Sequence, residues 1–297
     1  MRNSFFVFLG AGLWATDTLF RQPLLHDLSA LTIVFFEHLF ATIASFLWLM
    51  WFARRDFFMG MSQTLGAALI GVFGSVLATF CFTESFRLVN PSVSILLQKI
   101  QPLIVIGLSW LFLGEKITRT FFLWGALALI SAFFLSFPDG IRLTTLLGQA
   151  NHGAVLAFLA AVLWAISTVI GKATLSRANP AALSFWRFST GLVLLFVMVR
   201  QSPPLKIEAE FVWTEWTVLR SIAYMAIIPG FFGVYLYYRG LKKVSASSAT
   251  LLELSFPLTA VAINSIFLDL HLGKIQLLAA CSLLISMIGV GMSSRSN

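Results

Sequence analysis

Long apolar runs separated by short polar loops recur along the whole of this 297-residue chain. A helix rises about 1.5 Å per residue, so about 20 residues are needed to cross roughly 30 Å of hydrocarbon. Runs near that length fall at about 4–22, 30–52, 63–86, 91–113, 119–137, 153–172, 181–200, 217–239, 246–268 and 274–293. The pattern therefore predicts an all-α integral membrane protein with ten transmembrane helices. The longest expected linkers are 138–152 and 201–216.

Composition supports a membrane protein over a soluble one. Hydrophobic residues make up 59% of the chain and charged residues 11%, whereas soluble domains carry about 25% charged residues. The formal charge of +8 is spread between the apolar runs and forms no single basic patch. It therefore predicts membrane topology and no nucleic-acid partner.

The sequence carries no pattern typical of an enzyme or of a cofactor site. It has no phosphate-binding loop of the G-x-x-x-x-G-K-[S/T] type, so we expect no ATP hydrolysis. Cys81 and Cys281 both lie inside apolar runs, which indicates neither a disulfide framework nor a metal site. No nucleophile has a plausible base beside it, so we expect no catalysis, no cofactor and no metal.

The first twenty residues resemble a signal peptide, with a basic start followed by an apolar run. We favour a transmembrane helix instead, because residues 12–38 have a counterpart at 162–188. A segment that is repeated later in the chain belongs to the fold.

The chain contains an internal repeat. Residues 90–115 align without a gap on 245–270. The matched pairs at an offset of 155 include Ser92 with Ser247, Leu97 with Leu252, Gln98 with Glu253, Pro102 with Pro257 and Leu113 with Leu268. The repeat predicts two five-helix domains, 1–140 and 150–297. Because five is odd, the second copy enters the membrane from the opposite side, as in inverted-repeat secondary transporters.

Basic residues in the loops predict the orientation. With both termini inside, eleven Lys and Arg residues fall on the inner side and seven on the outer side. Short cytoplasmic loops carry the excess of Lys and Arg. We therefore expect cytoplasmic termini in a bacterial-type inner membrane.

Several motifs together resemble the EamA-type transporters of the drug/metabolite transporter superfamily. They are Gly12-Leu13-Trp14 with Val162-Leu163-Trp164, Phe185-Trp186-Arg187-Phe188, Leu113-Gly114-Glu115-Lys116, and Pro102 with Pro257. The resemblance covers nearly the whole chain. It implies ten helices in two inverted halves, with helices 1, 3, 4, 6, 8 and 9 around a central cavity. It also implies export or exchange of small metabolites, amino acids or drugs.

The chain departs from that family pattern at two places. Glu37-His38 stands where the family commonly has Arg-Phe, as the second half does at Arg187-Phe188. Residues 268–271 read Leu-Asp-Leu-His and lack the usual Gly-Glu. By the resemblance, neither departure touches the cavity.

Four charged residues, Glu37, Lys99, Arg187 and Glu253, lie well inside the predicted spans, and each needs a partner because a charge at mid-bilayer is costly. Glu37 and Lys99 lie at similar depths, about 10 and about 12 Å from the outer ends of their helices. Arg187 and Glu253 match in the same way from the inner side. We therefore predict Glu37–Lys99 and Arg187–Glu253 ion pairs.

These pairs have two interpretations. They either lock helix 2 to helix 4 and helix 7 to helix 9, or one carboxylate is a proton or substrate site. Glu253 is the better candidate, since it precedes Pro257 by one turn and a carboxylate in apolar surroundings can take up a proton near neutral pH.

Polar and aromatic side chains near these positions are the candidate cavity lining. The predicted set is Trp14, Gln98, Gln101, Trp164, Tyr235, Tyr238, Glu253 and Ser255. The two tryptophans are equally consistent with helix packing, and the tyrosines with an interfacial belt. Small residues on helices 3 and 8, among them Gly71 and Gly230, indicate close packing and bending.

Two further pairs lie near helix ends. Asp17 and Arg21 form an i,i+4 pair, and Glu84 and Arg87 an i,i+3 pair. A local ion pair is the simpler interpretation of each. The alternatives are a gate at the first pair and substrate steering at the mouth for the second.

The sequence therefore predicts a secondary transporter, most simply an exporter, of small organic metabolites such as amino acids. The expected partners are a small-molecule substrate, the lipid bilayer and protons as the coupling ion. The alternatives are a lipid-linked flippase or small multidrug exporter of the same superfamily, and, from another class, a membrane-embedded enzyme or sensor.

Overall fold

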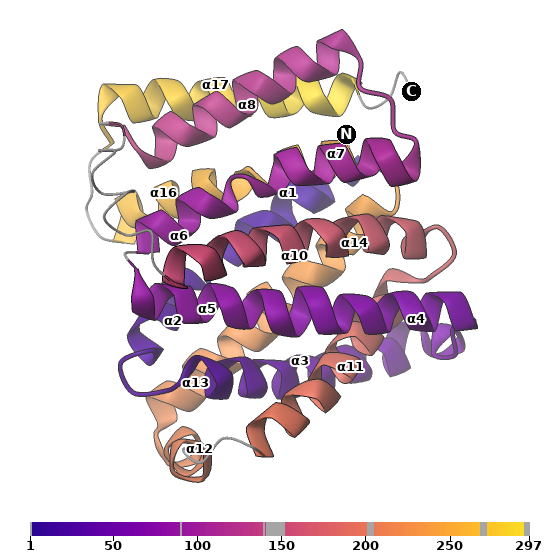
Figure 1. Ribbon diagram of the computed structural model, residues 1–297, viewed down its shortest axis with the longest axis vertical. Helices are drawn as coiled ribbons and strands as arrows, with labels where there is room; N and C mark the ends of the chain where they lie inside the picture. Colours follow the sequence, from indigo (N-terminus) through magenta and orange to yellow (C-terminus); the bar gives the residue numbers. More distant parts are fainter. Residues whose placement is uncertain are drawn as a thin grey trace.

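The computed structural model describes residues 2–89, 91–138, 140, 152–200, 205–267 and 272–293, and within them it is helical with no strand (Figure 1). Nine helical spans in this part of the chain are long and apolar enough to cross a membrane. Five of them are unbroken helices: α3 (Ala30–Phe52), α8 (Arg119–Ser136), α10 (His152–Leu175), α11 (Pro180–Arg200) and α17 (Lys274–Ser293).

The first predicted span is broken. It forms α1 (Arg2–Ala15) and α2 (Thr18–Leu24), separated by Thr16 and Asp17. The hydroxyls of Thr16 and Thr18 donate to the carbonyls of Leu13 and Ala15, at 2.8 and 3.0 Å. Such bonds to the preceding turn bend a helix. Because neither α1 nor α2 alone has the length of a span, a total of ten transmembrane helices stays a prediction.

Two other spans are interrupted just before a proline. Lys99–Ile100 separates α6 (Pro91–Gln98) from α7 (Gln101–Leu113), and Glu253–Leu254 separates α15 (Ala246–Leu252) from α16 (Ser255–Phe267). A proline has no N–H to donate and its ring clashes with the carbonyl four residues back. For Pro102 and Pro257 those positions are Gln98 and Glu253.

Two more spans contain a π-helical segment in the middle. Gly71–Leu77 joins α4 (Met61–Ile70) to α5 (Ala78–Leu88), and Ala226–Gly233 joins α13 (Trp216–Met225) to α14 (Val234–Leu241). In π-helical turns some carbonyls lose their usual i+4 partner and can bond elsewhere. Gly74 illustrates this, because its carbonyl accepts a hydrogen bond of 3.0 Å from the indole of Trp164.

The helices pack side by side, and the long axis of the molecule runs across the helix axes (Figure 1). The α8–α17 pair lies at one end, and α12 and α13 lie with α3 and α11 at the other. Ser131 on α8 and Ser282 on α17 are joined by a 2.9 Å hydrogen bond. Large apolar side chains on this pair, such as Phe122 and Leu278, face outward as expected in lipid.

The predicted linker 201–216 contains a helix, α12 (Leu205–Thr214), which corrects that expectation. Val212 is fully buried against α3 and α13, and Glu208 accepts hydrogen bonds from Ser29 and Thr32 at the start of α3. Most of the other predicted linker, 138–152, lies outside the described residues. A single 3₁₀ turn, Arg54–Asp56, follows α3.

Candidate functional site

A cavity of about 240 Å³ lies among the helices. Eight of the ten predicted spans contribute to its wall, and α8 and α17 contribute none. The predicted lining residues that do line it are Trp14, Gln98, Gln101, Trp164, Tyr238 and Glu253.

Glu253 lies on the cavity wall and is held by two neutral donors. The hydroxyl of Tyr237 donates to it at 2.6 Å and the side-chain amide of Gln101 at 3.1 Å. Tyr237 in turn packs on Trp14, with ring centroids 5.1 Å apart. The interruption before Pro257 therefore places a carboxylate in contact with both halves of the sequence.

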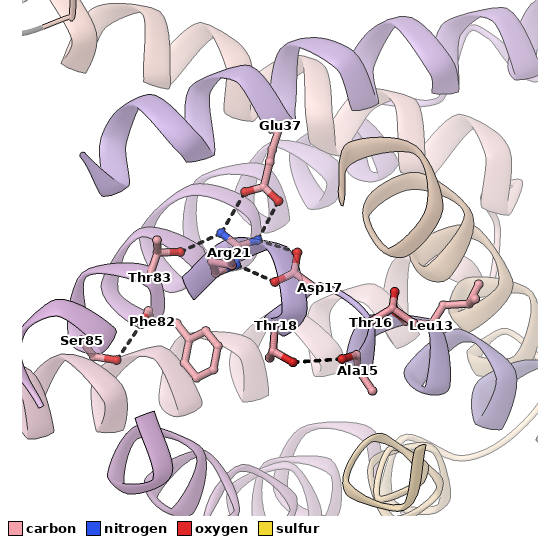
Figure 2. Close-up of polar contacts among 10 residues, drawn as sticks. All are labelled: Leu13, Ala15, Thr16, Asp17, Thr18, Arg21, Glu37, Phe82, Thr83 and Ser85. Atoms are coloured by element: carbon pink, nitrogen blue, oxygen red, sulfur yellow. Dashed lines mark hydrogen bonds and ion pairs between the residues drawn. The ribbon is translucent and has the colours of Figure 1, made fainter. Parts of the chain in front are cut away.

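Arg21 is the centre of a buried ion-pair cluster (Figure 2). Its guanidinium contacts Glu37 at 2.6 and 3.0 Å and Asp17 at 2.5 and 2.9 Å. It also donates to the hydroxyl of Thr83 at 2.9 Å. The cluster joins α2, α3 and α5, so the fully satisfied guanidinium is a cross-link within the first half of the chain.

The predicted Glu37–Lys99 pair is therefore wrong. Glu37 pairs with Arg21, which lies on α2 after the break at Thr16–Asp17. The ammonium of Lys99 lies 5.6 Å from the ring centroid of Phe256. Depth favours Lys99, because Arg21 falls near the end of the predicted span 4–22 when that span is taken as one unbroken helix.

The predicted Arg187–Glu253 pair is also wrong. Arg187 donates from Nε to Ser75 at 2.7 Å and from Nη1 to the hydroxyl of Tyr238 at 2.9 Å. Its guanidinium also lies over the rings of Phe188 and Tyr238, at 5.2 and 5.6 Å. Hydroxyls and rings satisfy this cation in place of the expected carboxylate.

Two predicted lining residues lie elsewhere. Tyr235 packs against Trp48, with ring centroids 5.4 Å apart, and Ser255 is fully buried with its hydroxyl 2.8 Å from the carbonyl of Phe8.

Tyr237 lines the cavity but is absent from the predicted lining. Its spacing of three from Val234, which also lines the cavity, places it on the cavity face of α14.

The two tryptophans line the cavity and also pack. The ring of Trp164 lies 5.1 Å from that of Phe82, and its indole donates to the carbonyl of Gly74 as described above.

The two predicted local ion pairs are both present. Asp17 and Arg21 form the expected i,i+4 ion pair. Glu84 and Arg87 form a local pair at 3.3 Å with Arg87 half exposed, and neither lines the cavity.

The sequence matches the EamA-like transporter family over residues 1–137 and 151–292. The chain belongs to the EamA-like transporter family. Together with the nine apolar spans of the described residues, this makes it a multi-pass integral membrane protein of a transporter family.

Relatives and a solved structure agree with that membership. The chain is 28% identical to a protein named riboflavin transporter ImpX from Fusobacterium nucleatum, over 98% of this chain and 97% of the relative. It is 25% identical to an uncharacterized transporter from Archaeoglobus fulgidus, over 67% of each. A crystal structure shares the fold with a TM-score of 0.78 and 13% identity, covering 99% of this chain and 98% of that one.

One expectation about this EamA protein needs correction. The departure at Glu37-His38 does touch the cavity, because both side chains line it. The Nδ1 of His38 lies 2.8 Å from the carbonyl of Val34, and its ring packs edge-on against Phe188 at 5.7 Å. Residues 268–271, the other departure, lie outside the described residues.

No group of three or more His, Cys, Asp or Glu side chains is placed to hold a metal ion within the residues that the structure describes. The cavity wall of this EamA protein combines aromatic, polar and charged side chains. Six of them are charged: Asp17, Arg21, Glu37, Lys99, Arg187 and Glu253.

Proposed function

We propose that this EamA protein is a secondary transporter that carries a small polar solute with an aromatic ring through its central cavity by alternating access. The observation that carries the proposal is the Gln101–Glu253 hydrogen bond on the cavity wall, which joins residues 152 positions apart. A site shared by two halves of a transporter can face either side as the halves rock against each other.

The proposed architecture is ten helices in two inverted halves, 1–140 and 150–297. Matched irregularities support it. The π-helical segments begin 155 residues apart, at Gly71 and Ala226, and the proline breaks at Lys99 and Glu253 begin 154 apart. Equivalent irregularities at a nearly constant offset are expected of a duplicated unit. We propose both termini on the cytoplasmic side of the inner membrane, from the excess of basic residues there.

Aromatic side chains on the cavity wall favour a ring-bearing solute. The rings are those of Trp14, Phe82, Trp164, Phe188, Tyr237, Tyr238 and Phe256. Ligand pockets of this kind hold rings by stacking and fix orientation with a few polar groups. Riboflavin, from the name of the Fusobacterium relative, and aromatic amino acids are the first solutes to test.

We propose outward transport with protons as the coupling ion, and Glu253 as the group that takes up the proton. Its partners Tyr237 and Gln101 are neutral, so the carboxylate is the charged member of that contact. Six charged groups on the wall favour a polar solute over the lipid tail that a flippase must pass.

Counterflow in proteoliposomes tests the proposal. Vesicles preloaded with unlabelled riboflavin, tryptophan or phenylalanine should accumulate the matching labelled compound transiently in at least one case. Empty vesicles and vesicles with a Gln101→Ala/Glu253→Ala variant serve as controls. No counterflow of any ring-bearing solute by correctly folded protein would contradict the proposal.

A further inference from the structure

The charges on the cavity wall are unevenly paired. Asp17 and Glu37 share Arg21, so each carboxylate of that cluster is in an ion pair with a cation of the protein. Glu253 is held by neutral donors. Among the described residues, no carboxylate forms an ion pair with either Lys99 or Arg187, and both line the cavity.

Lys99 is the more unusual of the two cations. Its backbone lies in the break between α6 and α7, and its side chain lines the cavity. Within the described part of the chain its ammonium donates to no oxygen, and it lies 5.6 Å from the centroid of the Phe256 ring. An ammonium has three N–H donors, and inside a membrane each needs an acceptor from protein, water or ligand.

Arg187 has donors to spare. A guanidinium offers five N–H groups, and the contacts with Ser75 and Tyr238 use one on Nε and one on Nη1. The second N–H of Nη1 and both of Nη2 have no acceptor among the described residues. Adjacent guanidinium N–H groups form the fork that binds carboxylate or phosphate through two parallel hydrogen bonds.

The surroundings of Arg187 differ from those of its counterpart in the first half of the chain. Glu37 and Arg187 occupy equivalent positions, 150 residues apart, with opposite charge. Glu37 forms an ion pair with Arg21, whereas Arg187 is held by the hydroxyls of Tyr238 and Ser75, which carry no charge. The cation is oriented by its neighbours and keeps its charge.

We propose that the transported solute carries an anionic group, a carboxylate or a phosphate, and that Lys99 and Arg187 are the residues that select it. This inference rests on the proposed transport of a ring-bearing solute and names the chemistry of its polar end. Phe256 beside Lys99 and Phe188 and Tyr238 beside Arg187 then offer ring faces next to both cations.

The test measures equilibrium binding to the full chain in nanodiscs, with pairs of ligands that differ only in the anion. One pair is indole-3-propionate and its neutral amide, and the other is flavin mononucleotide and riboflavin. The wild type should bind at least one anion about tenfold more tightly than its neutral partner. Charge-assisted hydrogen bonds to one cation are of that strength or greater.

Variants assign the preference to the two cations. Lys99→Gln and Arg187→Gln should each weaken binding of that anion by roughly 10- to 100-fold and change binding of its neutral partner by less than about twofold. Lys99→Arg should recover most of the anion binding. Lys274→Gln removes the same charge at an exposed position outside the cavity and should leave both ligands unaffected.

The outcomes separate the two proposals. If the neutral member of both pairs binds as tightly as its anion, or Lys99→Gln and Arg187→Gln weaken both members of the preferred pair equally, the anion inference is wrong and transport of ring-bearing solutes stands. If no member of either pair binds to monodisperse protein, ring binding and the anion inference fail together. Thermal unfolding of each variant, compared with Lys99→Arg, identifies losses caused by misfolding.

Discussion

Gln101 and Glu253 lie 152 positions apart in the chain and are joined by a 3.1 Å hydrogen bond in the cavity wall. Gln101 opens α7 after the break that ends α6, and Glu253 occupies the break between α15 and α16. Both breaks precede a proline, which interrupts the helical hydrogen bonding at that point. The two residues that form this bond therefore lie at or beside the two helix breaks.

Glu253→Gln should separate binding from coupling. The isosteric amide keeps one acceptor oxygen for Tyr237 or Gln101, and its NH2 group can donate to the other of these side chains. Solute binding should therefore change by less than about threefold. The dependence of transport on an imposed pH gradient should disappear, because the variant has no proton to release at this position. Solute uptake with and without the gradient is the measurement. Glu84→Gln, outside the cavity, is the control, and an unchanged gradient response in Glu253→Gln would refute proton coupling at this residue.

Arg21→Gln should destabilise the protein by about 3–5 kcal/mol, since it leaves the buried Glu37 and the partly buried Asp17 without their cation. Thermal unfolding in detergent measures the loss. The second substitution Glu37→Gln in the same chain should recover part of it, because it removes one of the unpaired charges.

The matched control for that cluster is Arg87→Gln. Arg87 and Glu84 form a surface pair at 3.3 Å with the arginine half exposed, and such pairs contribute about 0–1 kcal/mol. Equal losses for Arg21→Gln and Arg87→Gln would mean that the buried cluster does not stabilise the fold.

Gly10→Ala should block close packing of α1 against the second half. An added Cβ would lie 2.6 Å from the carbonyl oxygen of Gly233 and 2.9 Å from the backbone nitrogen of Tyr237, so one helix must move. We expect a lower yield of folded protein and weaker solute binding, because Trp14 and Tyr237 both line the cavity.

Gly107→Ala provides the comparison for that substitution. No atom lies within 4 Å of a Cβ added at Gly107, which is exposed on α7. Alanine should be tolerated there or add up to about 1 kcal/mol of stability through its helix propensity. Size-exclusion profiles and thermal unfolding of both variants check the pair, and equal tolerance of both would contradict the close α1–α14 approach.

Glu115→Gln should weaken the start of α15. The carboxylate accepts from the backbone N–H groups of Ala246 and Ser247 at 2.6 and 2.9 Å, and from the Ser247 hydroxyl at 2.6 Å. Loss of a charged acceptor at a helix N-terminus costs about 1 kcal/mol. Thermal unfolding should show this loss, and Glu215→Gln should not, because Glu215 precedes α13 without a capping bond.

The sequence predicted the positions of the helices well, for reasons that α3 makes plain. Its 23 residues, Ala30–Phe52, coincide with the predicted span because hydrocarbon thickness sets the length and polar loops set the ends. The breaks before Pro102 and Pro257 also follow from local chemistry. The break at Thr16–Asp17 was missed, because an isolated Thr-Asp-Thr sequence does not by itself dictate a bend.

The partners of the buried charges could not be read from the sequence. Depth along the helices favours Lys99 as the partner of Glu37, because Arg21 falls near the end of the predicted span 4–22. The observed partner depends on the break before α2 and on how α2 packs against α3. The same holds for Tyr235 and Tyr237, which are two residues apart but differ in which packed neighbour they meet. Rotation of helices about their axes is a property of tertiary packing.

The measurement that tests alternating access through the cavity most directly is thiol labelling of Gln98→Cys, with Cys81 and Cys281 replaced by alanine. Gln98 lines the cavity next to the proline break. A membrane-impermeant thiol reagent should label it in both right-side-out and inside-out vesicles, and a transported solute should protect it on both sides. Labelling from one side only, whatever the solute gradient, would contradict a cavity that opens alternately to the two faces of the membrane.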